Sequence, residues 1–470
     1  MDTTTITNST NTQVYRLRWV VAAVVLAANV MDLLDATIVN VAAPSIHREL
    51  GGGAATIQWL SAGYTLAFAV LLIAGARLGD ILGRRRLFLV GSAGFTFFSA
   101  ACSIAPTIGL LIAFRALQGA FGALMIPQGF GLMKEVFDDD AEFNKATGLF
   151  GPATGVAMLA APVLAGALVG ADLWGTGWRL VFLINIPIGV LTLPLAIRSL
   201  PRGATHPGVK LDIGGVWLVG LALVAIIYPL IQGRTDGWPA WAFVLLAAGA
   251  ILLLVFLRYE RGRKSSPLIE PTLLTNHTYL SGIAVALALF GAFGGLLLCV
   301  SLYGQLGEGW SPIHAGLMLT PMVVGMIVGM MGSLAVVRRL GRHVLHIGIL
   351  LIAVGAADLA TTSALVPGLL LIGAGAGASI GQLFQFILSS VSMDEVGSAS
   401  GVLEASQQLS TALGVAVLGS VFFSAFAGHA PTHALRNTAW ACLVPLAAAF
   451  VLVFRLPMHA REEQAQLKQR

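Results

Sequence analysis

The sequence predicts an all-α integral membrane protein, and two features of its composition support that prediction. Of its 470 residues, 57% are hydrophobic and only 10% are charged, whereas about 25% of residues are charged in an average soluble domain. Apolar runs long enough to cross a bilayer, about 20 residues each, recur along the whole chain with short polar breaks between them. These runs lack the ten-residue alternation of a membrane β-barrel, so we expect each one to be a helix.

Polar breaks divide the chain into fourteen apolar runs, and we expect each run to form one transmembrane helix. The expected spans are residues 17–44, 56–75, 86–104, 107–132, 144–170, 179–199, 212–232, 239–258, 278–303, 313–335, 343–364, 367–390, 398–424 and 437–456.

Two short motifs that each occur twice in the sequence, one of them with a substitution, indicate an internal repeat. The pair GR at 83–84, after the second run, recurs at 341–342 after the tenth, and ATG at 146–148, which opens the fifth run, is echoed by ASG at 399–401, which opens the thirteenth. They predict two six-helix pseudo-repeat bundles with an inserted helix pair between them. Two repeated bundles with a substrate site at their interface are the architecture of alternating-access transporters.

The distribution of lysine and arginine orients the chain. With a cytoplasmic N-terminus, 22 of these residues fall on the cytoplasmic side and four on the other: Arg48, Arg179, Arg234 and Arg436. Because cytoplasmic loops carry the excess of positive charge, we expect both termini in the cytoplasm. The N-terminal stretch lacks the basic region of a cleaved signal peptide, so we expect the first span to act as its own insertion signal. The expected segments are a cytoplasmic tail at 1–16, an N-terminal bundle at 17–199, the inserted pair with its flanking loops at 200–277, a C-terminal bundle at 278–456 and a cytoplasmic tail at 457–470.

One charge, Arg115, interrupts the fourth run. A guanidinium stays protonated and is costly to place in hydrocarbon, so a membrane helix keeps one only where it faces protein, a partner or water. Arg115 therefore indicates a transport pathway. The alternative is a structural role, in which the side chain bonds backbone carbonyl groups of a neighbouring helix.

The segment RLGDILGRRR at 77–86 resembles the loop signature of the major facilitator superfamily. Ala76 and Ile81 depart from that signature, and four residues match it: Asp80, Gly83, Arg84 and Arg85. A carboxylate beside an arginine cluster at a tight glycine turn can hold two helix ends together through charge-assisted hydrogen bonds. The resemblance implies a conformational latch, and the alternative interpretation is a positive-inside topology signal.

The segment RALQG at 115–119 resembles a fourth-helix motif that the family links to proton coupling. Two further segments, together with the fourteen expected spans, are similar to the fourteen-helix drug:proton antiporter branch of that superfamily. They are LDATIVNVAAP at 34–44 and WRLVFLINIPIG at 178–189. The antiporter signature of the fifth helix is altered, since three of its glycines are alanines here. Pro162 and Gly166 remain, so we expect a kinked, closely packed helix there.

An acid in the first expected span lies at the depth of Arg115. Asp35 is nine residues, or about 14 Å, from the outer end of its helix, and Arg115 is eight residues, or about 12 Å, from the outer end of the fourth. The resemblance makes these helices neighbours in one bundle and an Asp35–Arg115 pair plausible. Asp32 shares a face with Asp35, and we hypothesise that the three groups couple transport to protons. In the alternative, Asp32 faces a watery vestibule and Asp35 only anchors Arg115.

Other polar residues within apolar runs are candidates for the substrate cavity. Glu404 lies about 9 Å inside the cytoplasmic end of the thirteenth helix, where it would attract a cationic substrate or carry a second proton; alternatively, it extends toward the interface. The remaining candidates are the amides Gln118, Asn40, Gln305, Gln407 and Gln408.

The sequence favours a proton-coupled exporter of amphipathic small molecules, such as drugs, antibiotics or a secreted metabolite, in the bacterial inner membrane. The expected partners are the substrate, protons and the lipid bilayer, and we expect a monomer. A nucleotide-binding P-loop is absent, and the pattern indicates no cofactor, metal or nucleic acid; the proton gradient would supply the energy. One alternative is a symporter or uniporter that imports a metabolite. A more remote alternative is a membrane enzyme or scaffold, although no cluster of catalytic residues is evident.

Overall fold

The computed structural model describes residues 17–137, 139–172, 175–202, 211–263, 268–362, 364–392, 395–426 and 430–459. The predicted N-terminal tail, and the predicted C-terminal tail from residue 460 onward, lie outside these ranges. The described residues form helices and contain no strand, which confirms the all-α prediction. Thirteen helical segments in the described ranges are long and apolar enough to cross a membrane.

The first half of the chain contains α2 (Arg18–Leu50), α3 (Ala54–Leu82), α4 (Arg84–Ser103), α5 (Ile108–Val136), α6 (Asp140–Gly148), α7 (Phe150–Ala171), η2 (Gly177–Arg179), α8 (Leu180–Leu183) and α9 (Asn185–Ser199). The helix pair that follows is α10 (Ile213–Thr235) and α11 (Ala240–Gly262). The second half contains α12 (His277–Leu302), η3 (Tyr303–Gly307), α13 (Pro312–Met318), α14 (Thr320–Leu340), α15 (His343–Thr361), α16 (Leu365–Leu388), α17 (Val396–Phe426) and α18 (Pro431–Val453).

Most observed helices coincide with expected spans, and the fifth differs in its detail. The run expected at 144–170 is divided at Leu149 into α6 and α7. Helix α7 is not among the thirteen candidate spans, although its residues Ala160–Ala171 form a shorter apolar helix. The predicted total of fourteen spans and the division into domains therefore stay predictions.

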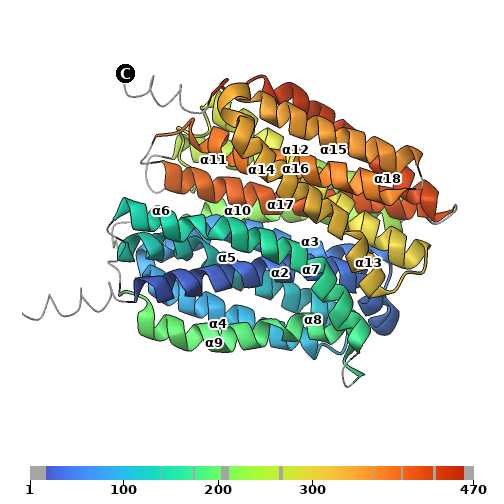
Figure 1. The fold of residues 1–470 in the computed structure, drawn as a ribbon, viewed down its shortest axis with the longest axis horizontal. Helices are drawn as coiled ribbons and strands as arrows, with labels where there is room; N and C mark the ends of the chain where they lie inside the picture. The colour runs from blue at the N-terminus through green and yellow to red at the C-terminus, as the bar shows by residue number, and fades with distance from the viewer. Residues whose placement is uncertain are drawn as a thin grey trace, which may run out of the picture.

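The helices of the two halves lie on opposite sides of the molecule, with their long axes roughly parallel (Figure 1). Helix α10 packs against α11 and also contacts α3 of the first half and α17 of the second. Helices α3 and α17 contact each other as well. The pair α10–α11 therefore lies beside the junction of the two halves rather than between them.

Glycine turns mark one end of the helices in both halves. Gly83 joins α3 to α4 with φ +93°, and Gly341 joins α14 to α15 with φ +52°. Residues other than glycine rarely adopt such positive φ angles. This explains why the sequence GR is repeated at these two turns. We call this the basic end, because Arg84 and Arg342 follow the turns; the opposite end carries the connections from α2 to α3 and from α12 to α13.

The halves are joined tightly toward the opposite end. The amide of Gln58 on α3 donates to the carbonyl oxygens of Val415 and Ala416 on α17, at 3.0 and 3.1 Å. A second contact joins η3 to α2, where the amide of Gln305 donates to the carbonyl of Val41 at 2.8 Å. These side chain to backbone bonds are buried, so they close the interface between the halves at this end.

Candidate functional site

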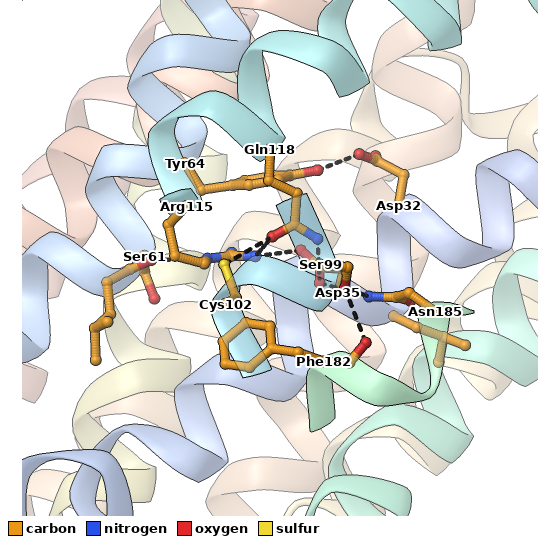
Figure 2. Close-up of polar contacts among 12 residues, drawn as sticks. Asp32, Asp35, Ser61, Tyr64, Ser99, Cys102, Arg115, Gln118, Phe182 and Asn185 are labelled. Atoms are coloured by element: carbon orange, nitrogen blue, oxygen red, sulfur yellow. Dashed lines mark hydrogen bonds and ion pairs between the residues drawn. The ribbon is translucent and has the colours of Figure 1, made fainter. Parts of the chain in front are cut away.

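Arg115 and Asp35 form a buried ion pair inside the first half (Figure 2). Arg115 lies on α5 and Asp35 on α2, and their exposed fractions are 0% and 1%. The guanidinium also donates to the carbonyl of Leu60 at 3.3 Å, and its carbon lies 4.3 Å from the ring centroid of Tyr64. A guanidinium in this position is compensated by an opposite charge, a carbonyl and an aromatic face.

The Asp35 carboxylate accepts two further hydrogen bonds through its other oxygen. The amides of Gln118 and Asn185 donate to Oδ1 at 2.9 and 2.8 Å. Gln118 in turn accepts from Arg115 at 2.9 Å, and the Asn185 amide also donates to Ser99 Oγ at 2.9 Å. The carboxylate thus has donors on both oxygens, an arrangement that fits its ionised form.

Three members of this cluster, Asn185, Ser99 and Tyr64, were not among the predicted site residues. Asn185 belongs to the segment WRLVFLINIPIG, where an asparagine in an apolar run is a signal for a buried hydrogen bond. Tyr64 is a weaker signal, since a tyrosine in an apolar helix needs only one partner for its hydroxyl.

Asp32 lies one helical turn before Asp35 and has a different hydrogen-bond partner. Its Oδ1 accepts a hydrogen bond from the hydroxyl of Tyr64, whose ring also covers Arg115 (Figure 2). Asp32 is 8% exposed, and Asp35 and Glu404 are both near enough to interact with it electrostatically. Tyr64 therefore connects Asp32 to the ion pair.

A cavity of about 980 Å³ opens between the halves at the basic end. Much of its wall is apolar and comes from α5, α14 and α16, with Glu404 and Gln407 contributed by α17. The cavity also reaches Arg77 and Arg84 near the glycine turn of the first half. A pocket of this size and character fits an amphipathic molecule of drug size.

The other predicted cavity residues lie elsewhere in this conformation. Gln118 is within the ion-pair cluster. Asn40 and Gln305 are at the closed interface, where Asn40 accepts from Ser61 at 2.6 Å and Gln305 donates to a backbone carbonyl. Gln408 is partly buried and is not part of the cavity wall. A substrate role for these four amides stays a prediction.

The predicted latch residues meet at the α3–α4 turn. Arg84 donates to Asp80 at 3.2 Å and lies 3.9 Å from Glu135 of α5, and Arg85 donates to the carbonyl of Ile197 on α9 at 2.5 Å. All these partners belong to the first half, and Gly83 provides the turn that brings them together.

Pro162 and Gly166 lie on α7, where it packs against α13 of the second half. A side chain at Gly166 would meet the backbone of Pro312 and Ile313, and one at Gly316 would meet the carbonyl of Pro162. Small residues therefore allow the two backbones to approach closely. This contact adds to the closure of the opposite end.

Comparison with known proteins places the chain in a family. The family model of the Major Facilitator Superfamily matches residues 25–415. The chain is 47% identical over 450 residues to the "Probable actinorhodin transporter" of Streptomyces coelicolor, covering 93% of this chain and 77% of that protein. It is 36% identical to the "Puromycin resistance protein pur8" of Streptomyces alboniger, covering 88% of this chain and 84% of that protein.

Solved structures agree in fold. A bacterial homologue of the human lysosomal transporter Spinster, in an inward-facing and unoccupied conformation, superposes with a TM-score of 0.64 at 17% identity, covering 93% of this chain and 97% of that one. A peptide transporter of the POT family in complex with sulfate gives a TM-score of 0.68 at 13% identity, covering 92% and 93%. The matched family model and the two relatives lead to one conclusion: this chain is a member of the major facilitator superfamily, and hence a multi-pass membrane transporter.

Proposed function

We propose that this transporter exports amphipathic small molecules from a bacterial cell in exchange for protons. Relatives that share about a third to a half of its residues are named as a probable actinorhodin transporter, a puromycin resistance protein and a tetracenomycin C resistance and export protein. These names support an antibiotic or a related secreted metabolite as the substrate.

The observation that carries the proton-coupling proposal is the buried Asp35–Arg115 pair. The described donors to Asp35 come from α5 and α9, and a cost of several kcal/mol accompanies the removal of one member of such a pair. A proton on Asp35 would replace Arg115 as the neutralising charge. Proton binding and the packing of α2 against α5 are therefore linked through one carboxyl group.

Asp32 and Tyr64 give this carboxyl group a connection to the cavity. Asp32 is near enough to Glu404, a residue of the cavity wall, for their charges to influence each other. Asp32 also accepts a hydrogen bond from Tyr64, whose ring covers Arg115. We infer that a proton or a cationic substrate at Glu404 is sensed at Asp35 through this line of groups. The latch at Asp80, Gly83, Arg84 and Arg85 would then break and re-form as the halves move.

The orientation in the membrane follows from charge. We propose that the basic end faces the cytoplasm of the cell, with both termini on that side and α7 as the fourteenth span. With its cavity open toward the basic end and its opposite end closed, the structure would then be an inward-open state, ready to take up substrate from the cytoplasm. We expect the protein to act as a monomer in the inner membrane.

Transport in everted membrane vesicles tests the proposal. Vesicles are first acidified inside by respiration, and ethidium or puromycin is then added while a fluorescent indicator reports the proton gradient. An exporter that exchanges drug for protons should partly collapse the gradient, and Asp35→Asn should remove that response. Glu142→Gln is a matched control, because Glu142 forms an ion pair with Arg18 outside the cavity. A gradient that grows on drug addition would instead indicate transport of the opposite sign.

A further inference from the structure

Two acids meet where the pair α10–α11 reaches the basic end. Asp212 precedes α10, and Glu260 lies in the last turn of α11. Their exposed fractions are 3% and 0%, and an oxygen of each carboxyl group lies within 3 Å of the position that a Cβ on Gly215 would occupy. They are 48 positions apart in the sequence and play no part in the transport site described above.

One oxygen of each carboxyl group is fully used by donors. Asp212 Oδ1 accepts from the backbone N–H of Gly215 at 3.0 Å and from the hydroxyl of Tyr259 at 3.1 Å, and lies 3.1 Å from the guanidinium of Arg263. Glu260 Oε2 accepts from the backbone N–H groups of the two residues that open the next segment, at 2.9 and 3.1 Å.

The other two oxygens have no donor among the described residues. Asp212 Oδ2 and Glu260 Oε1 are both buried without a hydrogen-bond partner. They lie 2.6 and 2.8 Å from one point, the position that a Cβ on Gly215 would occupy. Two buried carboxylates that face the same glycine would repel each other if both groups were ionised, and a side chain at position 215 would meet both oxygens.

We propose that Asp212 and Glu260 form a proton-binding site in which one proton is shared between Asp212 Oδ2 and Glu260 Oε1. The proton supplies the donor that both oxygens lack. It also balances the local charge, because the pair then carries one negative charge opposite the one positive charge of Arg263. Tyr259 and Arg263 are the other titratable side chains recorded against the pair, and both act on Asp212 Oδ1.

The site anchors a strap, residues 268–275, that crosses the basic end. Glu260 binds the first two backbone N–H groups of this strap. Farther along, Glu270 pairs with Arg77 of α3 at 2.9 Å, and Thr272 donates a hydrogen bond to Glu395 at the start of α17. The strap therefore ties the helix pair to both halves beside the mouth of the cavity, and loss of the shared proton would place two like charges at its first attachment.

Infrared spectroscopy of the full-length protein in lipid nanodiscs tests the proposal directly. The wild type at neutral pH should show the carbonyl absorption of a protonated carboxylic acid from this pair. Both Glu260→Gln and Asp212→Asn should lose that contribution, since an amide donates the hydrogen bond itself and leaves the other acid ionised. Using two variants keeps the test valid if one of them fails to fold.

Glu395→Gln is the matched control, because Glu395 holds the same strap without a second acid. Burial acts to raise the pKa of Glu395, but hydrogen bonds from Thr272 and Ser392 outweigh it and lower that pKa. Glu395→Gln should therefore leave the absorption of the protonated acid unchanged.

Thermal unfolding of the same samples provides a second readout. If the native pair holds a proton that unfolded carboxyl groups release at neutral pH, the wild-type melting temperature should fall more steeply with rising pH than that of Glu260→Gln. Retention of the acid absorption in both amide variants would overturn the proposal. So would a rise of the wild-type melting temperature with added Na⁺ or Ca²⁺ that Glu260→Gln abolishes, because a cation would then occupy the site.

Discussion

The two halves of this transporter share a helix order but are held together by different forces. In the first half, α5 carries Arg115, and a buried network of charge and hydrogen bonds joins it to α2, α3, α4 and α9. The corresponding helix of the second half, α16, contains no Asp, Glu, Lys or Arg. It packs through glycines instead, and side chains at Gly373 and Gly377 would meet the carbonyl groups of Met322 and Met326 on α14.

This difference shows where a proton can act. A proton that reaches the first half changes the charge on which the packing of α2 and α5 depends. In the second half, α16 packs against α14 through close backbone contact, and a proton would not change the charge of that contact. Among the described residues, the second half contributes one acid to the cavity wall, Glu404 on α17, and it is near enough to Asp32 of the first half for their charges to influence each other. The comparison predicts that charge variants act on coupling and that glycine variants act on folding.

Asp35→Asn should have the largest effect. The amide keeps the shape of the side chain but removes the charge that neutralises Arg115, so proton-driven export should fall by about a hundredfold or more. The measurement is drug-dependent proton release in everted vesicles, with the amount of inserted protein determined in parallel. Export at the wild-type rate would remove Asp35 from the coupling mechanism and weaken the contrast between the halves.

Gly373→Val in the second half should reduce the amount of folded protein rather than its coupling. The added side chain would meet the backbone of Met322, and overpacking of this kind costs at least about 1–3 kcal/mol. The melting temperature of the purified protein reports this loss. Gly381→Ala is the control, since no atom lies within 4 Å of a Cβ at that position; an equal loss in both variants would contradict the prediction.

Tyr64→Phe separates the two roles of Tyr64. The ring over Arg115 remains, while the hydrogen bond to Asp32 is lost, and a bond to a charged group contributes about 1.5–3 kcal/mol. We expect export to slow by about tenfold and its pH profile to shift, while drug binding is retained. Binding is measured by tryptophan fluorescence quenching, and an unchanged pH profile would show that Asp32 is not part of the coupling.

Glu404→Gln should have the smallest effect and should depend on the substrate. The carboxylate in the cavity attracts cations, so export of ethidium should fall several-fold, because an exposed or partly exposed charge pair contributes about 0.2–1 kcal/mol. Export of a neutral compound such as chloramphenicol should change little. Parallel resistance assays in a pump-deficient host provide the comparison, and equal losses for both compounds would indicate that Glu404 carries a proton instead.

Much of the architecture could be predicted from the sequence because membrane helices follow a local rule. A run of about 20 apolar residues has to satisfy its backbone inside lipid, so each run forms a helix whatever its neighbours are. The same rule identified Arg115 and Asp35, since charges within such runs are costly and stand out. Their equal depth follows from the rise of the helix, and the structure places them in contact.

The rest of the site was decided by how the helices pack. Which faces meet depends on side chains far apart in the chain, so the partners of Asn185 and Tyr64 and the wall of the cavity could not be derived from local pattern. Packing also placed Asn40 and Gln305 at the closed interface, because the halves are shut at that end. Asp212 and Glu260 show the same limit: each belongs to an ordinary helix end, and only the approach of α10 to α11 brings the two buried acids to the same side of Gly215.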